Sequence, residues 1–150
     1  MNILVDADAC PVKEIIVKCA KERGIPVTML IDTSHVLNDG YSKIITVDKG
    51  RDSADIRLVN LIVPGDLVVT QDFGVAAMAL AKGAEVLNQN GMVYDNQNMD
   101  RLLFERALGQ RIRRAGGRSG KNKKRTKADD EAFETTFLRM IGKNEQHEEN

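Results

Sequence analysis

Residues 2–13 read NILVDADACPVK, and this stretch decides the fold. Three strand-forming aliphatic residues lead directly into Asp6 and Asp8. Pro11 then suits the first turn of a helix, where its missing amide hydrogen is not needed. A short and wholly apolar run is typical of a strand that is buried on both faces of a parallel sheet. The sequence therefore predicts a buried strand that ends in two carboxylates and leads into a helix.

The same alternation continues along the chain. Apolar runs rich in Val and Ile predict strands at residues 3–5, 27–31, 43–47, 66–70 and 85–87. Helical spacing predicts helices at residues 11–23, 52–63, 74–82, 98–108 and 129–141. Such alternation implies right-handed crossovers and helices on both faces of a mostly parallel sheet. We therefore expect an α/β protein with three layers, α/β/α.

The chain is long enough for one domain with a real core and a short appendage. The expected parts are an α/β core (1–110), a basic arm (111–128), a helix packed on the core (129–141) and a disordered tail (142–150). No run is apolar and long enough to span a membrane, and the N-terminus does not resemble a signal peptide. We expect a cytoplasmic protein with no membrane partner, in which Cys10 and Cys19 stay reduced.

The formal net charge of zero conceals an uneven distribution. Residues 111–127, RIRRAGGRSGKNKKRTK, hold nine of the 22 Lys and Arg residues and no acid, which leaves 13 basic against 22 acidic residues elsewhere. Clustered cations between glycines, without aromatic residues, are typical of an arm that binds phosphates; a solvated linker is the simpler alternative. The candidate nucleic-acid-binding residues are Arg113, Arg114, Arg118, Lys121, Lys123, Lys124 and Arg125.

Aspartates follow several of the predicted strands. Asp6, Asp32 and Asp48 come directly after strand residues, and Asp72 stands two residues after Thr70. The carboxyl ends of parallel strands share one edge of a sheet, and this edge is where such folds bind ligands. Because clustered carboxylates repel one another, a divalent cation is the simplest partner for them. Mg²⁺ or Mn²⁺ suits carboxylate oxygens best.

Two further aspartates precede the second predicted helix. Asp52 would serve as an N-cap of that helix, whereas Asp55 continues its apolar face and needs a partner there, either Arg51 or a metal ion. Asp8 either caps the first helix or joins Asp6 at the metal. The candidate metal ligands are Asp6, Asp8, Asp52, Asp55 and Asp72, and the candidate catalytic residues are Asp6, Asp55 and Asp72.

Four motifs, DADACPVK, DKGRDSADI, GDLVVTQDFGVAAMAL and RRAGGRSGKNKKRTKADDEAFE, resemble the bacterial YaiI/YqxD family over residues 2–141. That family is in turn similar to the PIN-like nucleases, which hold divalent ions with acids after the first strand, on a helix and after a later strand. By position, the resemblance implies these roles for Asp6, Asp55 and Asp72, while Asp8 and Asp52 have no firm counterpart. PIN-type domains often carry one more acid shortly after the third position. Here residues 73–75 are Phe, Gly and Val, which leaves open whether one or two ions bind.

We expect a Mg²⁺ or Mn²⁺-dependent protein that hydrolyses RNA, with metal-activated water attacking the phosphodiester and the basic arm holding the RNA. One alternative is an aspartyl phosphatase of the haloacid-dehalogenase type, with Asp6 as nucleophile and Asp8 as acid and base. The order of Gly65 and Asp66 before the later strand argues against that alternative. A non-catalytic RNA-binding protein that uses only its basic arm is the other.

Overall fold

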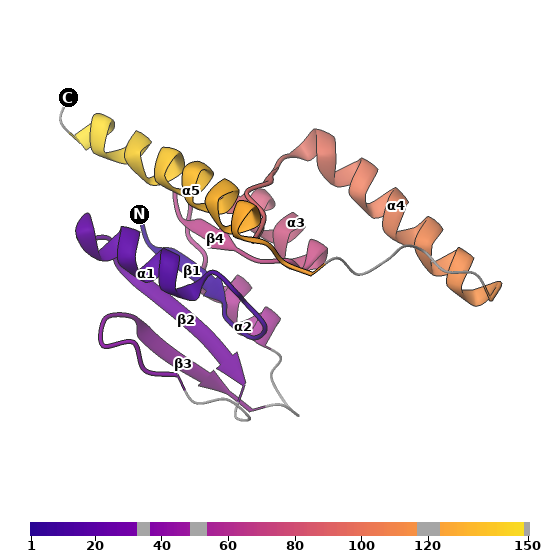
Figure 1. The fold of residues 1–150 in the computed structure, drawn as a ribbon, viewed down its shortest axis with the longest axis horizontal. Coiled ribbons are helices and arrows are strands. Elements are labelled where there is room, and N and C mark those ends of the chain that lie inside the picture. Colours follow the sequence, from indigo (N-terminus) through magenta and orange to yellow (C-terminus); the bar gives the residue numbers. More distant parts are fainter. Residues whose placement is uncertain (33–36, 49–53, 117–123, 149–150) are drawn as a thin grey trace.

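The structure is a computed structural model that describes residues 1–32, 37–48, 54–116 and 124–148 (Figure 1). Its strands are β1 (Ile3–Asp6), β2 (Val27–Asp32), β3 (Lys43–Val47), β4 (Leu67–Val69), β5 (Glu85–Leu87) and β6 (Val93–Tyr94). Its helices are α1 (Lys13–Glu22), α2 (Ala54–Leu61), α3 (Phe73–Ala81), α4 (Asn96–Arg114) and α5 (Lys127–Glu148). The five predicted strands and five predicted helices are confirmed. Strand β6 was not predicted, because two residues are too few to show a period.

The six strands form one sheet in the order β3-β2-β1-β4-β5-β6. All neighbouring strands run parallel except β5 and β6, which are antiparallel. In the register of β1 and β4, Val5 lies opposite Val69. The residues that follow them, Asp6 and Thr70, therefore lie side by side at the carboxyl edge of the sheet.

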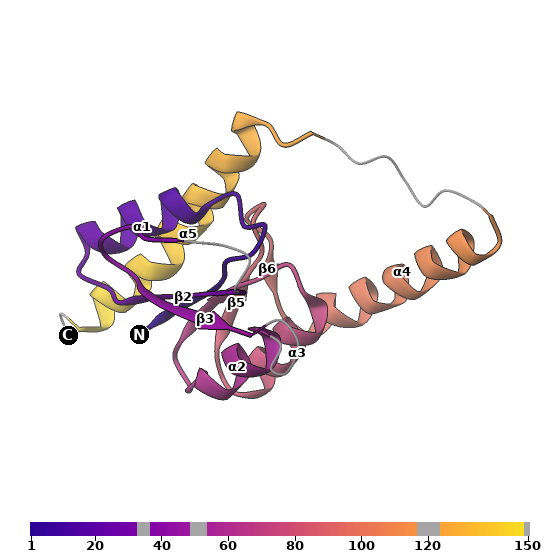
Figure 2. The ribbon, with the colours of Figure 1, turned by 90° about the horizontal axis from the view of Figure 1, so that it is seen from below.

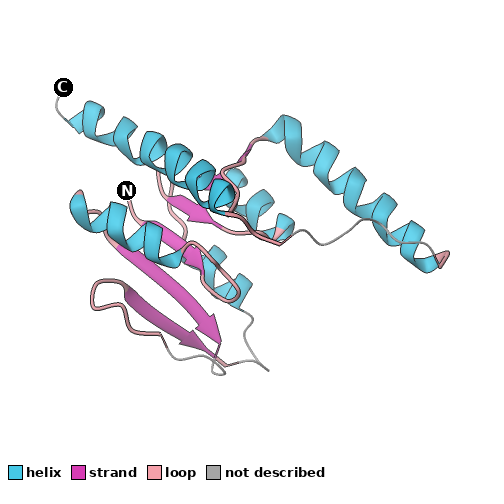
Figure 3. Ribbon diagram, in the orientation of Figure 1, coloured by secondary structure: helices cyan, strands magenta, loops and turns pink. Residues whose placement is uncertain are grey.

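The sheet separates two apolar cores, which gives the predicted three-layer α/β/α arrangement (Figures 2 and 3). Helices α1 and α5 cover one face, where Ile16 and Phe137 pack against the sheet. Helices α2 and α3 cover the other face through Leu58 and Ala76. Alternate residues of β1 serve the two faces in turn, which explains why its run is apolar throughout.

The last helix is fixed to the turn between β5 and β6. Gly91 in this turn has φ +87°, and a Cβ there would lie 2.6 Å from the backbone oxygen of Ala132 in α5. Only glycine allows both the left-handed backbone and this close approach. The start of α5 is also held, because the guanidinium of Arg125 donates to Asn90 Oδ1 at 2.8 Å and to the Gln89 carbonyl at 2.7 Å.

Both late helices are longer than predicted. Helix α4 continues to Arg114, so the basic arm begins on a helix, and α5 begins at Lys127. Helix α5 extends to Glu148, whereas the sequence predicted a helix that ends at residue 141. Both figures show α4 projecting from the body of the protein (Figures 1 and 2). Among the described residues, no helix has the length and apolar character needed to cross a membrane.

Candidate functional site

Asp6 is placed at the site by the central strand of the sheet. It is the last residue of β1 and is partly buried. The hydroxyl of Thr70, on the neighbouring chain segment, donates to Asp6 Oδ2 at 3.2 Å. The same hydroxyl accepts the backbone amide of Asp72 at 3.0 Å. Thr70 is only 2% exposed, so this hydroxyl holds Asp6 and the turn that carries Asp72 in a fixed relation.

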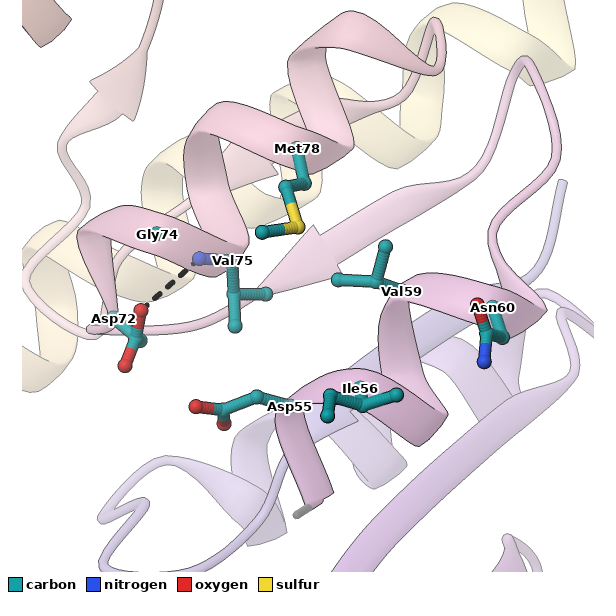
Figure 4. Close-up of a pocket in the computed structure, with 8 residues that line it drawn as sticks. All are labelled: Asp55, Ile56, Val59, Asn60, Asp72, Gly74, Val75 and Met78. Carbon is teal, nitrogen blue, oxygen red and sulfur yellow. Dashed lines mark hydrogen bonds between the residues drawn. The ribbon is translucent and has the colours of Figure 1, made fainter. Parts of the chain in front are cut away.

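Asp55 and Asp72 face each other across two helices (Figure 4). Asp55 lies in the first turn of α2, and Asp72 is the N-cap of α3, where its Oδ1 accepts from the Val75 amide at 3.0 Å. The two carboxyl groups are close enough to interact by a hydrogen bond. Their helices border a cavity of about 250 Å³ with walls that include Val59 and Met78. Asp72 therefore combines a capping role with a position at the mouth of this cavity.

The remaining aspartates of the predicted rim differ in position. Asp8 lies beyond β1, and its Oδ2 accepts the backbone amide of Asp32 at 3.1 Å. Ala9 next to it has φ +57°, which turns the chain toward α1. Asp48 follows the edge strand β3 and is exposed. Asp52 lies outside the described residues, so its predicted role stays a prediction.

Four of the carboxylates influence one another through their charges. The pKa of Asp6 is raised from 3.8 to about 6, first by burial and then by the charge of Asp55. Asp8 and Asp72 raise it further, while the hydrogen bond from Thr70 lowers it. Burial and then Asp72 likewise raise the pKa of Asp55. The fold thus concentrates negative charge at one place, as the sequence predicted for Asp6, Asp8, Asp55 and Asp72.

The described residues supply no ion-pair partner at the centre of this group. Within the part of the chain that the structure describes, no Lys or Arg forms an ion pair with Asp6, Asp55 or Asp72. Partly buried carboxylates that lie close together repel one another, and binding a cation or a proton relieves this repulsion. We refer to Asp6, Asp8, Asp55 and Asp72 below as the acidic group.

The acidic group fits a hard divalent ion in its chemistry, since it offers carboxylate oxygens next to a hydroxyl. The arrangement of its side chains fits a metal ion less well. Among residues 1–32, 37–48, 54–116 and 124–148, no set of three or more His, Cys, Asp or Glu side chains is arranged to hold a metal ion. Mg²⁺ commonly takes one or two carboxylates and keeps several waters, and the facing pair Asp55 and Asp72 matches that requirement.

The basic residues predicted to bind nucleic acid have different surroundings. Arg114, at the end of α4, and Lys124 are exposed. Arg125 instead forms an ion pair with Asp130 at 2.7 Å and the two bonds to the β5–β6 turn described above, which gives it a structural role. Arg113 belongs to α4, with its side chain outside the described part of the structure. Arg118, Lys121 and Lys123 lie outside the described residues.

Two side chains near the acidic group were not predicted to act there. From the sequence, Thr70 is only the residue two positions before Asp72. Its role follows from its place beside Asp6, which depends on the pairing of β1 with β4. Tyr94 lies near Asp72, since burial and then the Asp72 charge raise the pKa of its hydroxyl. Its ring meets that of Phe73 edge to face, with centroids 6.1 Å apart. Residues of β6 and the start of α3 therefore wall the site.

Both cysteines are free and buried, as expected for reduced thiols. Burial raises the pKa of the Cys10 thiol, so the thiolate is disfavoured despite its position before α1. A nucleophilic cysteine requires the opposite shift.

The adjacent residues Lys124 and Arg125 offer a matched test of structural against surface roles. We expect Arg125→Met to lower the free energy of unfolding by about 1–3 kcal/mol, because it removes charge-assisted hydrogen bonds to Asp130, Asn90 and Gln89. Lys124→Met should change it by less than about 0.5 kcal/mol. Urea unfolding of both variants checks this. Equal effects would contradict the anchoring role of Arg125.

Comparison with known proteins gives a consistent result over almost the whole chain. Residues 4–143 match the family model described as "Uncharacterized BCR, YaiI/YqxD family". A UPF0178 protein of Ruminiclostridium cellulolyticum is 69% identical over 141 residues, which cover 94% of this chain and 92% of that protein. UPF0178 proteins of Alkaliphilus oremlandii (53% identical, 96% and 93% covered) and Clostridium acetobutylicum (51%, 94% and 97%) are also similar. No solved structure matches this chain.

Proposed function

Since the chain belongs to the YaiI/YqxD family, we propose the function that its side chains support: Mg²⁺ or Mn²⁺-dependent hydrolysis of RNA phosphodiesters. The reaction centre is Asp6, Asp55 and Asp72. One observation carries the proposal, namely the convergence of Asp6 at the end of β1 with Asp55 of α2 and Asp72 at the start of α3, the last two lining one cavity. Burial and the charges of three other carboxylates oppose the ionisation of Asp6 and raise its pKa to about 6. A divalent cation would remove that opposition.

Each residue has a role that follows from its position. Asp55 and Asp72 face each other from two helices and would hold the ion, while Asp6 lies near enough for their charges to raise its pKa. Thr70 positions Asp6 by donating to one of its oxygens, which leaves the other oxygen available. A bound Mg²⁺ or Mn²⁺ supplies the activation of water and the neutralisation of phosphate charge that phosphodiester hydrolysis needs.

The position of the basic arm favours a polyanionic substrate. Its C-terminal end is fixed by Arg125 to the β5–β6 turn, and in the same turn the side chain of Gln89 accepts a hydrogen bond from Gln71, the neighbour of Asp72. The arm is thus attached close to the acidic group. Lys124 and Arg114, at the two described ends of the arm, are exposed to bind phosphates.

The likeness to PIN-like nucleases adds weight to this proposal, because the positions of Asp6, Asp55 and Asp72 match the acids of that pattern. The phosphatase alternative receives less support. It needs Asp8 as acid and base, whereas the Asp8 carboxylate accepts the backbone amide of Asp32 at the end of β2. A non-catalytic RNA-binding protein remains the second candidate, since an exposed basic arm can bind RNA without any metal.

The test is a cleavage assay on a mixed panel of labelled RNAs with Mn²⁺, Mg²⁺ or EDTA. We expect cleavage with either metal and none in EDTA. Asp72→Asn retains a side-chain oxygen for the α3 cap but loses the charge, so the cleavage rate should fall on the order of 100-fold or more. Asp48→Asn, at an exposed rim position, should cut like the wild type.

Two results would contradict the hydrolase proposal. One is an Asp72→Asn variant that cuts as fast as wild type, which would indicate a contaminating nuclease. The other is RNA binding without cleavage under every metal condition, together with a loss of affinity and of salt dependence in Lys124→Met. That outcome would favour the non-catalytic candidate.

A further inference from the structure

Large exposed apolar side chains gather in two places. Among the described residues, four lie on α2, α3 or the turn after α2, and four lie on α4. The first set includes Ile56, 58% exposed, and Met78, 54% exposed. The second includes Phe104, 69% exposed. Exposed apolar residues grouped in this way are typical of interaction sites.

The α4 set forms a stripe along one side of the helix. Phe104, Leu108 and Ile112 are four residues apart and therefore share a face, which we call the α4 stripe. The opposite side of α4 packs on its own chain through the buried Met99 and through Arg106, which lies 5.8 Å over the Phe73 ring. The α4 stripe consequently points away from the body of its own chain.

Two members of the other set, Ile56 and Met78, border the cavity between α2 and α3. Ile56 and Val59 of α2 and Val75 and Met78 of α3 line it, and Asp55 and Asp72 stand at one end (Figure 4). We call it the α2–α3 groove. The groove has apolar walls and carboxylates at one end. An apolar helix face with a cation beside it is complementary to such a groove.

The α4 stripe offers that combination. By helical spacing, Arg101 and Arg111 lie on the same side of α4 as Phe104 and Leu108. The apolar residues match the groove walls. Arg111 supplies the cation that matches the carboxylates of the groove, whereas Arg101 forms an ion pair with Glu105 of its own helix at 4.0 Å. Because the stripe faces away from its own body, it cannot reach the groove of its own chain.

We propose that two copies of this chain form a symmetric dimer in which the α4 stripe of each copy occupies the α2–α3 groove of the other. Two-fold symmetry makes this contact twice, so the α4 stripe and the exposed groove residues Ile56 and Met78 of both copies are covered. The dimer also places an arginine of one copy next to Asp55 and Asp72 of the other. That arginine would compete with a metal ion for Asp55 and Asp72, so the dimer is proposed for the metal-free protein. Its test is association in EDTA, which does not depend on RNA cleavage.

Sedimentation equilibrium on the full chain tests the dimer. The wild type should show twice the monomer mass of 16.6 kDa. Leu108→Glu in the stripe and Met78→Glu in the groove should each raise the dimer dissociation constant at least about tenfold, since each places a charge in an apolar contact. Leu103→Glu, on another side of α4, and Val63→Glu, outside the groove, are matched controls and should remain dimeric.

A mixing experiment distinguishes this arrangement from others. A Leu108→Glu copy keeps an intact groove and a Met78→Glu copy keeps an intact stripe, so an equal mixture should form a mixed dimer with one intact contact. Circular dichroism confirms that both variants are folded. The proposal is overturned if the wild type is monomeric. It is also overturned if Met78→Glu associates like wild type, as it would if two α4 stripes paired with each other.

Discussion

Asp6→Asn should make the metal-free protein more stable at pH 8. The cause is the position of Asp6 at the end of β1, where burial and then Asp55 raise its pKa to about 6. At pH 8 the ionised carboxylate is held in surroundings that oppose its charge, and asparagine removes the charge while it can still accept the Thr70 hydrogen bond. We expect a gain of about 1–2 kcal/mol in the free energy of unfolding, roughly half of what the full shift implies, because the side chain is partly exposed.

The pH dependence of this gain has a definite sign. Between the ordinary pKa of 3.8 and the folded-state value of about 6, the folded protein binds more protons at Asp6 than the unfolded chain does. The wild type therefore loses stability as the pH rises through this window and no further above it. The difference between Asp6→Asn and wild type should vanish near pH 4 and be complete by about pH 7.

Urea unfolding in EDTA between pH 4 and pH 8 measures the effect. Asp48→Asn is the matched control, because that carboxylate is exposed and does not influence Asp6. Added Mn²⁺ at pH 8 should raise the free energy of unfolding of the wild type by about 2.7 kcal/mol when its concentration is a hundred times its dissociation constant. The same Mn²⁺ concentration should stabilise Asp6→Asn much less. If Asp6→Asn were less stable than wild type at pH 8, burial and the neighbouring carboxylates would not oppose the ionisation of Asp6 as we describe.

Phe133→Ala should cause a large loss of stability. Phe133 is fully buried, and its ring stacks on that of Phe137 with centroids 5.3 Å apart. Both belong to the core that α5 shares with α1 and the sheet. Truncation removes apolar contact and leaves a cavity, so we expect a loss of about 3–5 kcal/mol.

The denaturant midpoint of Phe133→Ala gives this loss directly. Leu103→Ala on α4 is a suitable control, since Leu103 is 42% exposed and should contribute about 1 kcal/mol or less. An effect of Phe133→Ala as small as that of Leu103→Ala would mean that α5 does not depend on the apolar core for its attachment.

The sequence was sufficient for the elements and their order. The run from Ile3 to Val5 is apolar on both alternating sides, and that pattern needs a parallel sheet with helices above and below. Helix lengths were harder to predict. Helix α4 carries exposed apolar residues, so its pattern beyond residue 108 does not follow a single buried face and its end at Arg114 was missed.

The sequence predicted only part of the candidate site. Asp6 and Asp72 follow predicted strands, and the rule that ligands bind at carboxyl ends of parallel strands brought them together. The same rule included Asp32 and Asp48, although Asp48 is exposed beside the outermost strand β3. The order of the strands in the sheet decides which aspartates lie close together, and this order could not be predicted from the sequence.

The local pattern of apolar and polar residues in the sequence determined that this chain is a three-layer α/β protein with aspartates at the carboxyl ends of its strands. Only the tertiary structure decided which aspartates meet. Because β1 pairs with β4, Thr70 reaches Asp6 and holds the Asp72 turn beside it, and packing of α2 and α3 on one face brings Asp55 opposite Asp72. The role of Arg125 was likewise decided by long-range contacts, since its partners Gln89 and Asn90 lie 36 and 35 residues away.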